Sequence, residues 1–155
     1  MADFFDRIVI LKRTPIFCEV ATDDLRVVVE EMREEGFVKG ERVFEIRDPS
    51  DRMYVVLTGK IGISINPDPK VEDYVSIVEE GGCFGEMGPI DNAPRSGTAH
   101  VIEDAQLLYL DKLKLRALIS SYPEFAFGLL HGMSARVRDT SDKLLSARNG
   151  ETKRK

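Results

Sequence analysis

Apolar residues recur at helical spacing near both ends of the chain and at the spacing of strands between them. Residues 4–11 place apolar side chains on one helical face. A second such face covers 25–32, after a Thr-Asp-Asp start at 22–24 that suits a helix N-terminus, and Gly36 is a stop signal. Two helices within residues 2–35 are therefore predicted.

The middle of the chain has short runs rich in Val, Ile, Phe and Tyr, separated by turn clusters at 48–51 and 66–69. Gly40 and Gly59 stand beside these runs, where a backbone needs conformational freedom or a close neighbour. Short strands at such regular spacing are typical of a small barrel or jelly roll. Residues 37–110 are therefore predicted to form a β-roll.

Helical spacing returns after the β-roll, breaks at Tyr122 and Pro123, and resumes to about Ala147. Pro123 suits the first turn of a helix, where its missing N–H costs nothing. We therefore expect C-terminal helices within 112–147 and a flexible tail at 148–155. The predicted fold class is α+β, mainly β: an antiparallel β jelly-roll barrel flanked by N-terminal helices and a long C-terminal helix, in one domain.

Composition and charge narrow the function classes. The chain has 155 residues, 43% hydrophobic and 32% charged, as expected for a globular domain with one core. A formal net charge of −5 opposes broad attraction to nucleic acid, so no direct nucleic-acid partner is expected. No apolar run approaches the roughly 20 residues that span a bilayer, and residues 1–13 include acids, unlike a secretory signal. We expect no membrane partner and a cytoplasmic location.

The cysteines and histidines do not predict a metal site or a catalytic centre. Cys18 and Cys83 lie far apart without a CxxC pair, so both are predicted to be reduced thiols. His100 and His131 lack partners at ligand spacing. The sequence also lacks an adjacent nucleophile and base, and it lacks a P-loop. We therefore expect no metal, no cofactor, no catalytic residue and no enzymatic activity.

A glycine-rich segment, 81–99, interrupts the predicted strands. Glycines let backbone N–H groups approach an anion closely. Arg95 offers a fixed fork of donors that suits phosphate oxygens, and Ser96 adds another donor. Glu86 would repel a phosphate, so it is expected to bind another part of the same ligand, such as a sugar hydroxyl. A 3′,5′-cyclic monophosphate offers both groups.

Phe84-Gly85-Glu86-Met87 followed by Pro94-Arg95-Ser96 resembles the phosphate-binding cassette of cyclic-nucleotide-binding domains. Catabolite-activator-type regulators, cyclic-nucleotide-gated channels and cyclic-nucleotide-dependent kinases share that cassette. The resemblance extends from about Leu11 to Ala147. It implies that Glu86 accepts from the ribose 2′-OH and that Arg95 and Ser96 hold the cyclic phosphate. A structural ion pair between Glu86 and Arg95, in a pocket that has lost its ligand, is the alternative.

The cassette also departs from the family pattern. Gly88-Pro89 stands where the family often has an alanine and a leucine, and Gly97 replaces a common alanine. A shorter cassette helix or weaker apolar contacts are therefore expected. These departures bear on affinity more than on the class of ligand.

The last predicted helix carries a stripe with the spacing of a two-helix coiled coil. The stripe consists of Leu130, Met133, Val137, Thr140 and Leu144. It packs either on its own β-roll or in the seam of a homodimer, and the polar Thr140 favours the seam. Residues 133–143 resemble the dimer helix of the catabolite activator family, in which a Thr-Ser pair meets the adenine amino group. That resemblance implies that two residues contact the base: Thr140 of the subunit that binds the nucleotide, and the partner subunit's Ser141.

Arg136 lies one helical turn before Thr140, near enough to approach Glu86 or the ligand. The Thr-Ser pair favours cAMP over cGMP, with cGMP left open. The predicted ligand-binding residues are Phe84, Gly85, Glu86, Met87, Arg95, Ser96, Gly97, Arg136, Thr140 and Ser141.

The leading hypothesis is a sensor in which a cyclic nucleotide changes the position of the last helix or its dimerisation. A second hypothesis is the sensory part of a catabolite-activator-type transcription regulator, or of a channel, whose effector part lies outside this chain. A third is a dimerisation scaffold with a vestigial pocket.

Overall fold

The computed structural model describes residues 2–153 of the chain and the side chains of residues 2–150. The chain begins with two helices, α1 (Phe4–Arg13) and α2 (Thr22–Glu31). A capping box between Asp3 and Asp6 satisfies backbone N–H groups at the start of α1. Leu11 on α1 and Leu25 on α2 are fully buried, whereas Phe4 and Phe5 at the start of the predicted face of α1 are exposed.

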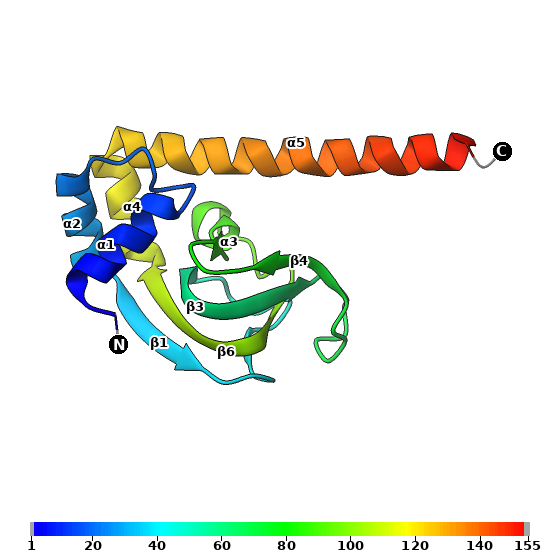
Figure 1. Cartoon of the computed structure of the whole chain (residues 1–155), viewed down its shortest axis with the longest axis horizontal. Coiled ribbons are helices and arrows are strands. Elements are labelled where there is room, and N and C mark those ends of the chain that lie inside the picture. Colours follow the sequence, from blue (N-terminus) through cyan, green and yellow to red (C-terminus); the bar gives the residue numbers. More distant parts are fainter. Residues whose placement is uncertain (1, 154–155) are drawn as a thin grey trace.

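One antiparallel sheet follows, in which β6 and β3 are the longest strands and pair along most of their length. The hydrogen-bonded order is β1-β6-β3-β4, while β2 also pairs with β6 and β5 with β3 (Figure 1). The strands are β1 (Arg33–Phe37), β2 (Arg42–Phe44), β3 (Arg52–Ser64), β4 (Tyr74–Val78), β5 (Cys83–Phe84) and β6 (Thr98–Asp111).

The α+β, mainly β fold class predicted from the sequence is confirmed, as a jelly-roll-like fold. The sheet is not a closed barrel, because no pairing within residues 2–153 joins β1 to β4. The prediction that Gly36 ends the second helix is wrong. Helix α2 ends at Glu31, and Gly36 lies in β1 opposite Gln106 of β6. Pairing with β6 supplies the backbone hydrogen bonds of this stretch, so tertiary contacts outweigh its helix-favouring glutamates.

Three helices complete the chain: α3 (Met87–Asp91), α4 (Lys112–Ser121) and α5 (Pro123–Lys153). The short α3 lies between β5 and β6, inside the glycine-rich segment. Helix α5 continues beyond Ala147, so the predicted tail is helical as far as Lys153, and residues 154–155 lie outside the described residues. Within residues 2–153 no helix has both the length and the apolar character needed to cross a membrane.

The N-terminal part of α5 packs against the segment that connects α1 to α2. Phe125 stacks on Phe17 with ring centroids 5.0 Å apart. Gly128 approaches the carbonyl oxygen of Ile16 so closely that a Cβ atom would collide with it. These contacts belong to an apolar core between the helices and one face of the sheet, whereas a second core fills the inside of the β-roll.

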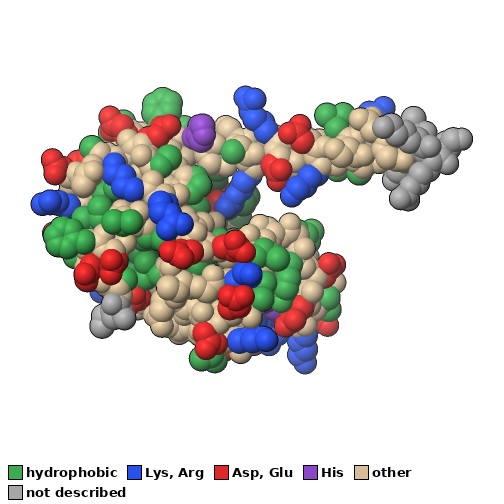
Figure 2. All heavy atoms as spheres, viewed as in Figure 1, with side chains coloured by type: hydrophobic (Ala, Val, Ile, Leu, Met, Phe, Trp, Pro, Cys, Tyr) green, Lys and Arg blue, Asp and Glu red, His purple; other side chains and the backbone are tan. Residues whose placement is uncertain are grey.

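The distal half of α5 stands clear of the sheet, and Figure 2 shows open space beneath it. Val137 is 67% exposed and Leu144 is 66% exposed, and Leu130 is exposed as well. The interpretation in which this stripe packs on its own β-roll is therefore wrong. Leu130, Val137 and Leu144 therefore form an exposed apolar line along the described part of α5.

Candidate functional site

A pocket of about 480 Å³ lies between the 84–97 segment, β4 and one face of α5. Its volume falls in the range of sites for small organic ligands, about 300–1,000 Å³. All the predicted ligand-binding residues except Ser141 line this pocket. Those residues are Phe84, Gly85, Glu86, Met87, Arg95, Ser96, Gly97, Arg136 and Thr140. Ser141 is exposed on α5, and its predicted role belongs to a second subunit.

Arg95 is buried, with 6% of its surface exposed. One terminal nitrogen, Nη1, donates to the Gly85 carbonyl oxygen at 2.9 Å, and Nη2 donates to the Arg52 carbonyl oxygen at 2.7 Å. The guanidinium carbon lies 3.9 Å from the centre of the Phe44 ring. Burial lowers the pKa of Arg95, although nearby Tyr54 and several acids oppose the shift.

The positive charge of Arg95 is not neutralised by a direct ion pair. Among the described residues, no carboxylate oxygen lies within 4.0 Å of its guanidinium nitrogens. Its Nε atom is buried and has no hydrogen-bond partner. A buried cation held only by carbonyls and a ring is costly, because its hydration has been lost without a counter-charge. An anion in the pocket would remove that cost.

Glu86 is 3% exposed, and its Oε1 atom forms an ion pair with Nη1 of Arg136 on α5. Arg136 also donates from Nη2 to the Cys83 carbonyl oxygen at 3.2 Å. The alternative of a structural Glu86–Arg95 ion pair is therefore wrong, because the carboxylate has Arg136 as its partner. The second oxygen of Glu86, Oε2, is buried without a partner and can still accept a hydrogen bond.

Cys83 is an inert neighbour of this ion pair. Burial, assisted by the charge of Glu86, raises the pKa of the Cys83 thiol to about 12. A thiol with so high a pKa is protonated at neutral pH, which opposes both thiolate chemistry and metal binding. Within the part of the chain that the structure describes, no three His, Cys, Asp or Glu side chains are grouped as metal ligands.

Glycine is required at two points of the cassette for different reasons. Gly85 has a φ of 77°, and a Cβ atom there would lie 2.7 Å from Nη1 of Arg95. A side chain at this position would be strained and would displace the guanidinium. At Gly88 the space of a Cβ atom is filled by the side chain of Ser50, whose hydroxyl is buried without a partner. Ser50 therefore explains why alanine does not fit at position 88.

The backbone of Arg95 is fixed by the loop that follows β2. The N–H of Arg95 donates to the Asp48 carbonyl oxygen at 2.8 Å, and the N–H of Arg47 donates to the Arg95 carbonyl oxygen at 2.8 Å. Arg47 adopts a φ of 74°, which is unusual for a residue with a side chain. Two backbone bonds thus align this loop with the cassette.

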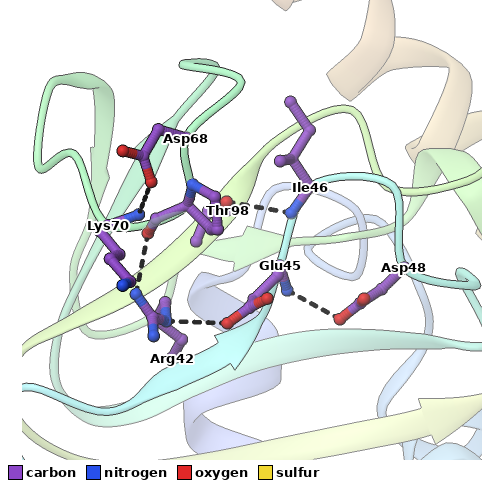
Figure 3. A network of polar contacts seen from close by, with 8 residues as sticks. Arg42, Glu45, Ile46, Asp48, Asp68, Lys70 and Thr98 are labelled. Atoms are coloured by element: carbon purple, nitrogen blue, oxygen red, sulfur yellow. Dashed lines mark hydrogen bonds and ion pairs between the residues drawn. The ribbon is translucent and has the colours of Figure 1, made fainter.

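Figure 3 shows the polar network that holds the same loop in place. Arg42 forms an ion pair with Glu45 at 3.0 Å, and the N–H of Glu45 donates to Asp48 Oδ2 at 2.9 Å. The N–H of Ile46 donates to the hydroxyl of Thr98, the first residue of β6, at 3.0 Å. The turn that contains Asp48 is therefore hydrogen-bonded to β6, the strand that follows the cassette. The backbone of Arg95 is held by this turn.

Several pocket residues were not predicted from the sequence. Phe44 and Ser50 come from segments far from the cassette, and no local signal marks either residue. Asp139 and Lys143 line the pocket beside Thr140 and pair with each other at 3.1 Å. Helical spacing is the signal that would have identified both, because Asp139 lies three residues after Arg136 and Lys143 three residues after Thr140.

Comparisons with known proteins agree with this geometry. The family described as cyclic nucleotide-binding domain matches residues 34–122 of the chain. A CRP-like cAMP-activated global transcriptional regulator of Mycobacterium tuberculosis is 29% identical over 135 residues, which make up 87% of this chain and 60% of that protein. The chain belongs to the cyclic nucleotide-binding domain family. It spans 60% of the length of this mycobacterial relative.

Solved structures show the same fold. The N-terminal domain of a transcriptional regulator from Streptomyces coelicolor has a TM-score of 0.69 at 30% identity, covering 86% of this chain and 95% of that one. The Thermus thermophilus catabolite activator protein has a TM-score of 0.77 at 26% identity, covering 84% of this chain and 62% of that one. The fold and the family match therefore define the class of this chain as a cyclic nucleotide-binding domain.

Proposed function

We propose that the chain is a sensor module that binds a 3′,5′-cyclic mononucleotide, with cAMP preferred to cGMP. One observation carries the proposal: a buried arginine without a counter-ion and a buried carboxylate with an unpartnered oxygen line the same pocket. The first group requires an anion, and the second accepts from a neutral donor such as a hydroxyl. A cyclic phosphate fused to a ribose with a free 2′-OH supplies both.

Each predicted residue then has a defined task. Arg95 and Ser96 hold the cyclic phosphate, since the guanidinium keeps unused N–H groups beyond its two carbonyl partners. Glu86 accepts from the ribose 2′-OH through Oε2, and the backbone of Gly85 lines the sugar. Phe84, Met87 and Gly97 form the surrounding wall.

The purine is expected to lie between the cassette and α5. Thr140 lines the pocket from α5, at a distance along the helix that leaves room for a base beyond Arg136. An adenine amino group can donate to the Thr140 hydroxyl, but the same hydroxyl can donate to a guanine carbonyl, so this contact alone does not select adenine. The cAMP-activated mycobacterial relative supports adenine as the base.

A second subunit completes the proposed site. The exposed stripe on α5 has the spacing of a coiled-coil seam, and pairing two such helices would cover Val137 and Leu144. The partner subunit's Ser141 would then approach the base. A seam of about two heptads gives little stability to an isolated coiled coil. We therefore expect the ligand, which lies between the helices and the cassette, to add to the stability of the dimer.

Arg136 supplies the link from ligand to helix. It joins α5 to the cassette through Glu86 and the Cys83 carbonyl. A ribose hydroxyl arriving at Glu86 changes the set of partners around that carboxylate, and the position of α5 responds. The ligand shifts α5 only as far as it binds one helix position more tightly than the other.

Isothermal titration of the purified protein with cAMP, cGMP and linear AMP tests the proposal. We expect cAMP to bind more tightly than cGMP, and AMP to bind weakly because its phosphate carries more charge and is not cyclised onto the ribose 3′-oxygen. Arg95→Ala should weaken cAMP binding by about 100-fold or more, given about 1.5–3 kcal/mol for each hydrogen bond to a charged group. Arg13→Ala, at an exposed arginine that does not line the pocket, is the matched control.

Absence of heat with both cyclic nucleotides, or equal affinity for cAMP and AMP, would contradict the sensor function. If the wild type binds no cyclic nucleotide and Arg95→Ala leaves dimerisation unchanged, the chain is a scaffold with a vestigial pocket.

A second candidate function is suggested by the alignment with the mycobacterial regulator, of which this chain spans 60%. The domain then serves as the sensory part of a transcription regulator whose effector part lies elsewhere. Sequencing the transcript on both sides of the region that encodes this chain would reveal any adjoining effector segment. Joining such a segment to this domain in a ligand-dependent reporter assay then separates this candidate from a sensor that acts alone.

A further inference from the structure

The aromatic residues inside the β-roll form a connected cluster behind the cassette. Tyr54 stacks on Phe84 with ring centroids 5.2 Å apart, and Phe44 contacts both rings at 6.1 and 5.9 Å. Phe44 is the last residue of β2, where it pairs with Ala99 of β6. Two strands and two rings therefore hold the Phe44 side chain in one orientation.

One face of the Phe44 ring is covered by the guanidinium of Arg95, at 3.9 Å from its centre. The ring has a negative π face, so it attracts the cation and offsets part of its lost hydration. The carbonyls of Gly85 and Arg52 fix two edges of the same guanidinium. The plane of Arg95 is thus defined by three contacts, and none of them carries a net negative charge.

The neutral character of these three contacts has a consequence for binding. A carboxylate in the place of Phe44 would hold Arg95 just as firmly, but it would neutralise the charge and compete with a phosphate. A ring and two carbonyl dipoles orient the cation and leave its full charge available to an anionic ligand.

We propose that Phe44 is a positioning residue that fixes the plane of the Arg95 guanidinium for the phosphate of the ligand. This inference rests on the proposed cyclic-nucleotide function and deepens it. Phe44 acts through Arg95, so its contribution should disappear when Arg95 is absent.

The test compares Phe44→Leu, which removes the ring and keeps an apolar side chain, with Phe44→Tyr and Phe44→Trp, which keep a π face. Binding of cAMP is measured by titration calorimetry, and weak binding by competition with a fluorescent cAMP analogue. Phe44→Leu should weaken cAMP binding about 5- to 30-fold, the range of a desolvated cation–π contact, and the two aromatic variants should bind within about 3-fold of the wild type. Phe44→Met replaces Phe44→Leu if the latter does not fold.

Two controls separate positioning from a general structural effect. Val28→Ala creates a cavity in the other core, at a residue of α2 that does not line the pocket, and should lower the melting temperature without changing cAMP affinity. Adenosine keeps the purine and ribose but lacks the phosphate, so its weak binding should be unchanged by Phe44→Leu.

A double-mutant cycle decides the outcome. In the Arg95→Ala background, Phe44→Leu should have no further effect on cAMP binding. An equal loss in both backgrounds, or a loss of adenosine binding of the same size, overturns the positioning role. If the wild type binds no cyclic nucleotide, the proposed function itself fails, whereas wild-type binding with an unaffected Phe44→Leu variant refutes only the role of Phe44.

Discussion

Replacing Gly85 by alanine combines backbone strain with a collision at the proposed phosphate site. The φ of 77° is unfavourable for any residue with a Cβ atom and costs about 1–2 kcal/mol. The new Cβ atom would also lie 2.7 Å from Nη1 of Arg95, so the guanidinium must move and lose its hydrogen bond to the Gly85 carbonyl. That lost bond adds about 1–3 kcal/mol.

Gly40 provides a matched control, because its φ of 93° is also positive and nothing lies within 4 Å of the position of a Cβ atom. Gly40→Ala should therefore show the backbone strain alone. We expect both variants to lose stability in urea unfolding, with Gly85→Ala losing about 1–3 kcal/mol more. Only Gly85→Ala should lose cAMP affinity in titration calorimetry, by about tenfold or more because Arg95 is displaced.

Normal cAMP binding by Gly85→Ala would show that the position of Arg95 does not control binding. An equal loss of affinity in Gly40→Ala would assign the effect to general strain in the β-roll. Either result refutes the reasoning that joins Gly85 to the phosphate site.

Two further predictions concern the dimer and the response to pH. Val137→Lys places a charge in the exposed stripe of α5 and should shift the protein towards monomer in analytical ultracentrifugation, most clearly with cAMP present; an unchanged mass for Val137→Lys would rule out the seam. Burial and the charge of Arg42 lower the pKa of His100, against an opposing effect of Glu72. Because the pKa of His100 is lower in the folded protein than in the unfolded chain, the unfolded chain takes up a proton first as pH falls. The contribution of His100 to the free energy of unfolding is therefore complete above about pH 6.5 and declines below it. Urea unfolding from pH 7.5 to 5.5 should show a smaller loss of stability for His100→Gln than for the wild type, and parallel curves would contradict this.

The order of elements and the composition of the pocket could be predicted largely from local sequence. The spacing of apolar residues locates the helices and the β-roll, because each element must bury one face of its own period. The boundary near Gly36 was placed wrongly, since β1 forms only by pairing with β6, which lies far along the chain. Long-range pairing outweighs the local preference of a short, glutamate-rich segment for helix.

The sequence by itself determined which chemical groups are present: an arginine and a glutamate in a glycine-rich segment, followed by a helix with an apolar stripe. The tertiary structure alone decided their partners. It paired Glu86 with Arg136 instead of Arg95, and it placed the ring of Phe44 beneath the guanidinium. Such partners are set by the register of β2 on β6 and by the direction of α5. Neither can be obtained from local periodicity, because hydrogen bonds and burial act between residues that are neighbours only in space.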